Sequence, residues 1–317
     1  MPSSKLSLES LPSLAGKTYV VTGGNAGIGY STVAGLASRG ARVYMGARSE
    51  RRAAEAIAEL RAEMPSADVR FLSLDLSSLA SVVAAARRLR GAETALHGLI
   101  NNAGIMGVPF AVTDDGYEIQ FQTNYMSHWL LTLHLLPLLQ ETSAATAQLT
   151  RVVNVTSDGH ERFAPAGGIE FDDLGLESQN AMTRYGQSKL ANVLHAKELH
   201  RRYGPGASAT GGSICTAAVH PGHIDTQATG AAPSLLLRAV TPMMRCVGIL
   251  DEQDKGALSS LYVIASDDFN ESESGAYVVP YAVIGTPSKY AQDPALATKL
   301  WEWTEAQLLE RGLLSLE

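Results

Sequence analysis

Residues 19–29 of the chain read YVVTGGNAGIG, and this stretch decides the fold. A short apolar strand runs into a glycine-rich turn and then into a helical segment. Gly23 allows the sharp turn from strand to helix, while Gly27 and Gly29 remove side chains where the backbone must approach a pyrophosphate and pack on a sheet. The start of the helix presents free N–H groups and the positive end of its dipole to a phosphate. The strand before the turn and the helix after it favour a dinucleotide-binding turn over a glycine-rich loop without a ligand.

The remainder of the 317 residues alternates between short apolar runs and helical stretches. The apolar runs predict strands at Thr18–Thr22, Arg42–Ala47, Val69–Leu74, Gly98–Asn101, Arg151–Thr156, Cys215–Val219 and Ala276–Val279. Helices are expected at 28–39, 50–63, 78–90, 115–140, 185–203 and 253–266. Continuous apolar strands that alternate with helices are typical of a parallel sheet covered on both faces, so we expect a single doubly wound α/β domain with seven, mainly parallel strands. Such sheets bind ligands beyond the carboxyl ends of their strands.

Composition narrows the class of protein. The formal charge of −7 argues against nucleic acid as a partner, because a nucleic-acid binder would carry a basic excess. Two cysteines, Cys215 and Cys246, cannot build a disulfide framework, and they favour a reducing, cytoplasmic location. The N-terminal residues lack the apolar run of a signal peptide, and the most apolar segments, 130–139 and 234–250, are too short or too interrupted to span a bilayer. We therefore expect no integral membrane segment, while loose membrane contact through 234–250 stays open.

The end of the second predicted strand bears on the choice of cofactor. NAD-binding folds usually hold the adenosine ribose with an acidic residue there, but this strand ends in Ala47 and Arg48. A guanidinium can pair with a 2′-phosphate through two hydrogen bonds, so Arg48, with Arg52 as a helper, favours NADP(H) over NAD(H). The alternative is that Arg48 only begins a solvated helix.

A tyrosine and a lysine in the segment Tyr185-Gly-Gln-Ser-Lys189 are candidates for acid–base chemistry. Positions i and i+4 of a helix share one face, so Tyr185 and Lys189 are expected to point the same way. A nearby ammonium and an oxidised nicotinamide would both stabilise the phenolate, and lowering its pKa by about three units requires about 4 kcal/mol. Without other motifs, a tyrosine and a lysine at this spacing on a helix are about as readily explained by chance as by a catalytic role.

Five motifs in order resemble those of the classical short-chain dehydrogenase/reductase family, a resemblance that covers about residues 15–285. They are Thr22-Gly-x-x-x-Gly-Ile-Gly29, Asn101-Asn-Ala-Gly104, Ser157 preceded by Thr156 in place of a first serine, Tyr185-x-x-x-Lys189 and Pro221-Gly-x-x-x-Thr226. The resemblance implies catalytic roles for Asn124, Ser157, Tyr185 and Lys189. It implies a cofactor site formed by Gly23, Asn25, Ala26, Gly27, Ile28, Gly29, Arg48, Asp75, Leu76, Asn102, Ala103, Gly104, Tyr185, Lys189, Pro221, Gly222, Ile224 and Thr226. Asp75 would lie near the adenine ring, with a turn-capping role as its alternative.

The roles that follow from the resemblance describe hydride transfer with a nicotinamide cofactor. Ser157 would orient the substrate carbonyl, and Tyr185 would donate a proton to the developing alkoxide. Lys189 would lower the tyrosine pKa and hold a ribose hydroxyl, while Asn124 would anchor a water for reprotonation. No metal is expected, because His220 and His223 have no companion ligands at a convincing spacing.

Several stretches resemble the retinol-dehydrogenase-like branch of that family, namely 101–106, 115–121, 184–192 and 277–303. This resemblance implies a lipophilic or aromatic carbonyl or alcohol as substrate. The stretch 162–182 is expected to form an insert beside the pocket, with Phe163, Phe171 and Met182 as lining. Residues 223–250 occupy the position of the family's substrate loop.

The same resemblance bears on assembly. Relatives commonly pair through the helices expected near 115–140 and 185–203, so a homodimer is one expectation. The C-terminal extension, Thr286–Glu317, offers the alternative that it covers one of those faces. Trp301 and Leu308 at i, i+7 spacing within it indicate helical packing.

These observations together predict an NADP(H)-dependent carbonyl reductase or alcohol dehydrogenase. Two other functions stay as alternatives. A catalytically silent NADP-binding sensor or scaffold would share the phosphate turn but would not need Ser157, Tyr185 and Lys189 together. An epimerase or dehydratase of the extended branch also uses the YxxxK motif, but the GxxxGxG turn and the lack of a sizeable C-terminal substrate domain count against it.

Overall fold

A computed structural model of the chain describes residues 8–207, 214–222 and 253–314. Within these ranges one sheet has the strand order β3-β2-β1-β4-β5-β6-β7-β8. The strands are β1 (Thr18–Thr22), β2 (Arg42–Ala47), β3 (Asp68–Ser73), β4 (Gly98–Asn101), β5 (Thr150–Val155), β6 (Ile214–Val219), β7 (Ala276–Val279) and β8 (Val283–Gly285). All neighbouring strands pair in parallel except β8, which is antiparallel to β7. The order reverses between β1 and β4, which is the position of the ligand crevice in a doubly wound sheet.

The doubly wound, mainly parallel sheet is confirmed, but it has eight strands where the sequence predicts seven. The additional strand is β8, in which Val283 and Ile284 are 38% and 47% exposed. With three residues, β8 is shorter than each of the other seven strands, and so short a run does not by itself predict a strand. It therefore escapes a prediction based on apolar runs.

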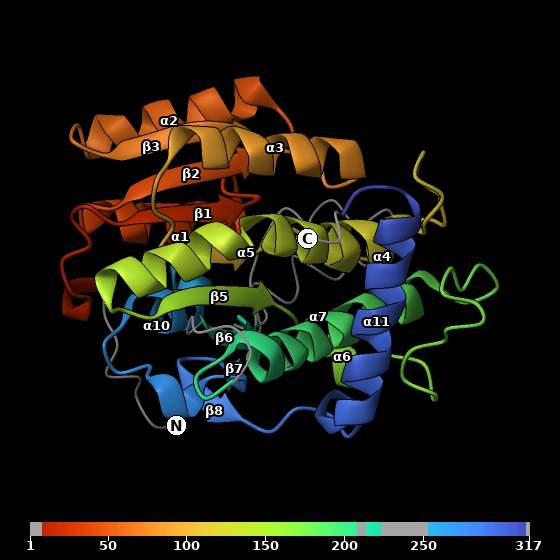
Figure 1. Cartoon of the computed structure of the whole chain (residues 1–317). Helices are drawn as coiled ribbons and strands as arrows, with labels where there is room; N and C mark the ends of the chain where they lie inside the picture. The colour runs from red at the N-terminus through yellow and green to blue at the C-terminus, as the bar shows by residue number, and fades with distance from the viewer. Residues whose placement is uncertain (1–7, 208–213, 223–252, 315–317) are drawn as a thin grey trace, which may run out of the picture.

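Helices cover both faces of the sheet, as Figure 1 shows. One face carries α1 (Gly27–Ser38), α2 (Glu50–Glu63) and α10 (Gln253–Ala265), and the other carries α3 (Leu79–Ala92), α5 (Ser127–Thr146) and α7 (Ala181–Tyr203). Each set encloses its own apolar core against the strands. Among the helices of the described ranges, none combines the length and the apolarity needed to cross a bilayer.

The C-terminal extension contains a further helix, α11 (Pro294–Glu310), which packs across α7 (Figure 1). Asp293 begins this helix, because its carboxylate accepts hydrogen bonds from the N–H groups of Ala295 and Leu296 at 2.9 and 3.2 Å. Trp301 is fully buried, and its ring lies edge-on to Trp129 of α5 with 4.9 Å between the centroids. The extension thus lies against both of the helices through which the sequence suggests pairing.

The helix predicted over 115–140 is interrupted and begins later. A short α4 (Ile119–Phe121) leads into a π-helical turn, Gln122–Met126, and only then into α5. The start is delayed because a bridge joins Val112 to Glu118, whose carboxylate caps α4 by accepting from the Phe121 N–H at 2.7 Å. Single π-helical turns often lie at functional sites. This one contains Asn124.

Candidate active site

A cavity of about 330 Å³ lies at the carboxyl ends of β1 to β4. It brings together seven of the residues predicted to bind the cofactor, namely Gly23, Asn25, Arg48, Asp75, Leu76, Ala103 and Gly104. Arg52, the predicted helper of Arg48, and Ser49 also line it. The cavity therefore has the position and the lining expected for the adenosine half of a dinucleotide.

The glycine turn needs its glycines for two different reasons. Gly23 and Gly27 have φ values of +66° and +56°, which lie in the left-handed region. Gly29 has no such backbone, but a Cβ atom on it would lie 2.3 Å from the Gly23 carbonyl oxygen and 2.6 Å from the Asn102 amide nitrogen. A side chain at that position would force α1 away from the strands. Because the N-cap residue of α1, Ala26, has no side-chain acceptor, the first N–H groups of the helix keep no side-chain cap and can meet a phosphate.

Thr22 and Asn102 hold the ends of β1 and β4 together. The Asn102 side chain donates to the Thr22 carbonyl oxygen at 2.9 Å. The Thr22 hydroxyl oxygen accepts from the backbone N–H groups of Asn102 and Ala103 at 2.9 and 3.0 Å. The two strand ends therefore form one rigid floor beneath the crevice.

Asp75 closes a turn at the edge of the cavity. It lines the cavity, and its carboxylate accepts hydrogen bonds from the Ser77 N–H and hydroxyl at 2.9 and 2.6 Å. These contacts fix the carboxylate in a turn just before α3. A role toward adenine stays a prediction.

The four residues predicted to be catalytic converge from three elements. A Cβ atom on Gly104 would lie 3.2 Å from Asn124 Oδ1 and 3.3 Å from Lys189 Nζ. A Cβ atom on Gly159 would lie 2.9 Å from the Tyr185 ring and 3.4 Å from Ser157 Oγ.

The pair Asn124–Lys189 and the pair Ser157–Tyr185 lie close to each other, because Tyr185 and Lys189 both belong to α7. The Lys189 ammonium lies 5.7 Å from the centroid of the Tyr185 ring. The structure therefore brings the phenol, the ammonium, the hydroxyl and the amide to one place beside the end of β4.

Burial dominates the electrostatics of this cluster. It raises the pKa of Tyr185 to about 12, against a smaller opposing effect of a hydrogen bond with Ser157. It lowers the pKa of Lys189 to about 8, and the ammonium donates to the Val155 carbonyl oxygen at 3.0 Å. The sequence suggests a lowered tyrosine pKa, whereas in the structure desolvation raises this pKa. Tyr185 is thus a phenol, able to donate a proton, over the whole neutral range.

The π-helical turn connects Asn124 to the strand ends. The Asn124 side chain accepts from the Ile105 N–H at 2.8 Å and donates to the Ile105 carbonyl oxygen at 2.9 Å. Its own carbonyl oxygen lies 2.9 Å from Nδ1 of the buried His128, whose Nε2 lies 2.8 Å from the Thr22 hydroxyl.

Burial lowers the pKa of His128 to about 4. In the resulting neutral ring Nδ1 must donate to the Asn124 carbonyl, so Nε2 accepts from Thr22. This connection was not found from the sequence, which indicates only that His128 is a helix residue.

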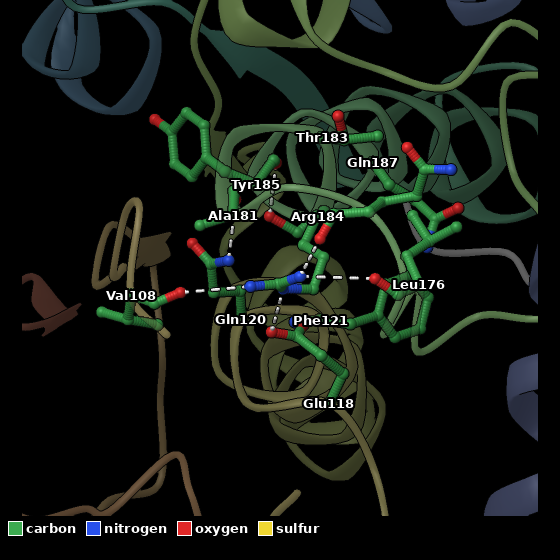
Figure 2. A network of polar contacts seen from close by, with 12 residues as sticks. Val108, Glu118, Gln120, Phe121, Leu176, Ala181, Thr183, Arg184, Tyr185 and Gln187 are labelled. Atoms are coloured by element: carbon green, nitrogen blue, oxygen red, sulfur yellow. Dashed lines mark hydrogen bonds and ion pairs between the residues drawn. The ribbon is translucent and has the colours of Figure 1, made fainter. Parts of the chain in front are cut away.

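A buried arginine next to the tyrosine organises the walls of the site (Figure 2). The Arg184 guanidinium donates to the carbonyl oxygens of Gln179 and Leu176 at 2.5 and 3.3 Å, and to that of Val108 at 3.4 Å. Its Nε lies 3.5 Å from a carboxylate oxygen of Glu118, and both side chains are at most 5% exposed.

Arg184 therefore ties two segments to the first turn of α7: the one after β4 and the insert before α7. Glu118 and Arg184 lie in different motifs, and no sequence spacing indicates that they pair.

Three candidate pocket residues from the insert take different positions. Phe163 is 38% exposed, and a Cβ atom on Gly186, the neighbour of Tyr185, would lie 2.8 Å from its Cβ. The Met182 sulfur would lie 3.6 Å from a Cβ atom on Gly107. Phe171 instead packs on the core with the Lys299 ammonium 4.1 Å from its ring centroid, so it serves the packing of α11.

The remaining predictions fall at the end of β6. Pro221 and Gly222 follow that strand, and Gly222 has a φ of +100°. Ile224, Thr226, His223 and the predicted substrate loop 223–250 lie outside the described residues. Across the part of the chain that the structure describes, no group of three or more His, Cys, Asp or Glu side chains is placed to hold a metal ion.

A family model described as short chain dehydrogenase matches residues 17–168. The short-chain dehydrogenase/reductase drtF of Aspergillus calidoustus is 52% identical over 309 residues, which span 96% of this chain and 98% of that protein. The chain belongs to the short-chain dehydrogenase/reductase family. It is an oxidoreductase of the retinol-dehydrogenase-like branch, since retinol dehydrogenase 12 of Mus musculus is 36% identical over 291 residues, 91% of this chain and 85% of that protein.

Solved structures agree with this assignment. An uncharacterised protein from Mycobacterium paratuberculosis has a TM-score of 0.74 and 32% identity, covering 95% of this chain and 97% of that one. RhlG of Pseudomonas aeruginosa in an active-site complex with NADP has a TM-score of 0.64 and 25% identity, covering 90% of this chain and 98% of that one. The fold is therefore one whose members bind NAD(P)(H).

Removal of the buried arginine should destabilise the protein in a pH-dependent manner. Arg184→Met leaves the Glu118 carboxylate buried without its cation, and we expect a loss of about 3–5 kcal/mol in the free energy of unfolding at pH 8. Burial already raises the pKa of Glu118, so as the pH falls this carboxyl takes up a proton in the folded state and the loss becomes smaller. Denaturant unfolding at pH 5 and pH 8 measures both effects.

The matched control is the double variant Glu118→Gln/Arg184→Met. It carries no titrating group at this position, so its free energy of unfolding should lack the pH dependence that Arg184→Met shows. Equal losses for Arg184→Met at both pH values would contradict the assignment of a buried ion pair.

Proposed function

We propose that the protein is an NADP(H)-dependent carbonyl reductase or alcohol dehydrogenase that acts on a lipophilic or aromatic small molecule. The observation that carries the proposal is the convergence of four side chains near the cofactor cavity: Asn124 and Lys189 lie beside Gly104, which lines that cavity, and Ser157 and Tyr185 lie together beside Gly159. A bound nicotinamide would supply or accept the hydride. The chain supplies geometry and proton transfer.

The choice of NADP(H) rests on the cation pair in the adenosine half of the cavity. Arg48 and Arg52 line it together with Ser49, which caps α2. A 2′-phosphate there would meet two guanidinium groups and the N-terminus of α2, and no acidic residue ends β2 to oppose it. NAD(H), without that phosphate, gains nothing from these cations.

The proton-transfer roles follow from the contacts of each side chain. Tyr185 stays protonated because burial raises its pKa, so it is suited to donate a proton to a developing alkoxide. Ser157 Oγ accepts from the Gly159 N–H at 3.1 Å, which fixes the hydroxyl beside the tyrosine, where it can orient a carbonyl.

Lys189 lies beneath the Tyr185 ring and can hold a ribose hydroxyl. The carbonyl oxygen of Asn124 has a second lone pair besides the one that His128 occupies, and it can anchor a water.

A lipophilic substrate is supported by the apolar side chains around the tyrosine. Phe163 is partly exposed next to Gly186, and Met182, about one turn before Tyr185 on α7, lies against the segment at Gly107. Burial of an apolar ligand against such side chains contributes roughly 25 cal/mol per Å².

We also propose a cytoplasmic location, which the scarcity of cysteine favours. Helix α11 packs across α7 and against Trp129 of α5, the two helices through which a homodimer would pair. This packing favours the alternative in which the C-terminal extension covers that face.

The first test concerns Tyr185 as the general acid. Tyr185→Phe should lower kcat by about 10²- to 10⁴-fold, the contribution of a positioned general acid, while the Kd for NADPH changes little. Turnover is followed at the nicotinamide absorbance with a panel of aromatic and aliphatic ketones. Tyr203→Phe, on the same helix, is the matched control and should turn over like the parent. Parent-like turnover by Tyr185→Phe would remove the proposed role, and no turnover of any ketone by the parent would favour the silent sensor.

The second test addresses the cofactor. Arg48→Ala removes a charge-assisted hydrogen-bonding partner of the 2′-phosphate, so the Kd for NADPH should rise by about 10- to 100-fold while that for NADH stays within about twofold. Arg51→Ala is the control, because Arg51 is exposed and pairs with Glu55. Equal losses for NADPH and NADH would exclude phosphate pairing by Arg48.

The third test uses pH. Because the pKa of Tyr185 is raised to about 12, the phenol predominates at neutral pH, and ketone reduction should vary little between about pH 6 and pH 8. Alcohol oxidation needs the phenolate, so its rate should rise with pH over the same range, by at most about tenfold per unit. Profiles of kcat in both directions provide the measurement. An oxidation rate that is independent of pH would argue against Tyr185 as the base.

A further inference from the structure

A second buried histidine lies three residues after Ser157 and has no part in the roles proposed so far. His160 belongs to the short helix α6 (Gly159–Arg162) and is 2% exposed. Its Nδ1 lies 2.6 Å from the carbonyl oxygen of Ser157, and its Nε2 lies 3.1 Å from the backbone nitrogen of Ser288. The ring packs edge-on against Tyr277 of β7 with 5.1 Å between the centroids.

These two contacts assign the proton of the ring. The Ser288 N–H can only donate, so Nε2 must be the acceptor. The Ser157 carbonyl can only accept, so Nδ1 must carry the proton. Burial also lowers the pKa of His160, which keeps the ring neutral. His160 is therefore a fixed bridge that donates at one edge and accepts at the other.

The partner at the far side of this bridge belongs to the C-terminal extension. Ser288 lies between β8 and α11, in a segment whose own turn is closed by the Gln292 side chain donating to the Pro287 carbonyl at 2.8 Å. The same segment reaches the insert, because the Tyr290 hydroxyl donates to the Ala166 carbonyl oxygen. The extension thus contacts the region after Ser157 at two points.

The backbone of Ser157 is held from two directions. Its neighbour Thr156 donates through its hydroxyl to the Lys189 carbonyl at 2.7 Å and through its N–H to the Val219 carbonyl at 2.8 Å. These bonds fix the side toward the sheet. On the other side the Ser157 carbonyl receives the His160 proton.

We infer that His160 is a positioning residue that couples the C-terminal segment at Ser288 to Ser157 and thereby holds the serine hydroxyl in register with Tyr185. The inference rests on the proposed function, because it requires Ser157 to orient the substrate. Displacement of a reacting or orienting group by about 1 Å can cost about 100-fold in rate. The C-terminal extension then belongs to the framework of the active site.

The two hydrogen bonds of His160 can be removed separately in the full chain. In His160→Asn the amide nitrogen takes the place of Nδ1, so the bond to Ser157 is kept and the bond to Ser288 is lost. In His160→Gln the amide oxygen reaches the place of Nε2, so the bond to Ser288 is kept and the bond to Ser157 is lost. We expect kcat to fall by about 100-fold in His160→Gln and by about tenfold or less in His160→Asn, with the Kd for NADPH unchanged.

A double-mutant cycle separates positioning from general destabilisation. Ser157→Ala removes the group through which His160 acts, so His160→Gln should cost about 100-fold in the parent and almost nothing when added to Ser157→Ala. Single-turnover measurements with saturating NADPH give these rates. His134→Gln is the matched control, because Nε2 of His134 also bonds the C-terminal extension, at the Leu313 carbonyl, but lies away from Ser157. It should lower Tm without lowering kcat.

Each outcome decides the inference. Parent-like kcat in His160→Gln, or additive losses in the cycle, would overturn it, and so would parallel losses of kcat, Tm and NADPH affinity in both His160 variants. If His160→Gln does not fold, His160→Asn still tests the inference, because this variant keeps the hydrogen bond to Ser157. A fall in kcat as large as that of Ser157→Ala would then show that this hydrogen bond does not position the serine, and would overturn the inference. Parent-like turnover by Ser157→Ala would instead contradict the proposed function, which keeps the two failures distinguishable.

Discussion

The close approach of α1 to the ends of β1 and β4 is the constraint on which the rest of the site depends. Gly29 lies so near the Gly23 carbonyl and the Asn102 amide that only a hydrogen atom fits between them. This contact aims the N-terminus of α1 at the crevice. Thr22, just before the turn, holds Asn102 and Ala103 through its hydroxyl, and the next residue, Gly104, lies against Asn124 and Lys189. The phosphate turn and the candidate catalytic residues therefore share one foundation.

Buried polar bridges carry this foundation further into the protein. Thr22 donates to His128, and His128 donates to the Asn124 carbonyl, so the end of β1 is linked to the π-helical turn. Arg184 performs a similar task at the start of α7, where it gathers carbonyl oxygens from two loops beside a buried carboxylate. Buried polar and charged side chains cost free energy when they lose their hydrogen-bonding partners, so displacement of these side chains is unfavourable. The arrangement is therefore rigid. In a hydride-transfer enzyme, rigidity of this kind sets the distances between reacting groups.

The sequence predicts those parts of the molecule that local patterns encode. The buried strands carry continuous apolar runs, and the bounds of β1, β2 and β4 agree with the predictions. The glycine turn lies between β1 and α1, as its motif predicts, and Tyr185 and Lys189 lie together on α7, with the ammonium 5.7 Å from the ring centroid. Strand β8 and the late start of the helix at Ile119 were missed, because a short exposed strand and a bridge from Val112 to Glu118 leave no periodic signal. The histidine bridges and the pairing of Arg184 with Glu118 join segments far apart in the chain, so only the fold brings them together.

The contact between Trp129 and Trp301 beneath α11 affects the fluorescence of the protein. The chain has three tryptophans, and two of them, Trp129 and Trp301, face each other where α5 and α11 meet, both shielded from water. An indole in apolar surroundings emits at shorter wavelengths than one in water. The intrinsic fluorescence of the protein therefore reports directly on whether α11 is seated, without any added label. Undocking of that helix would appear as a red shift.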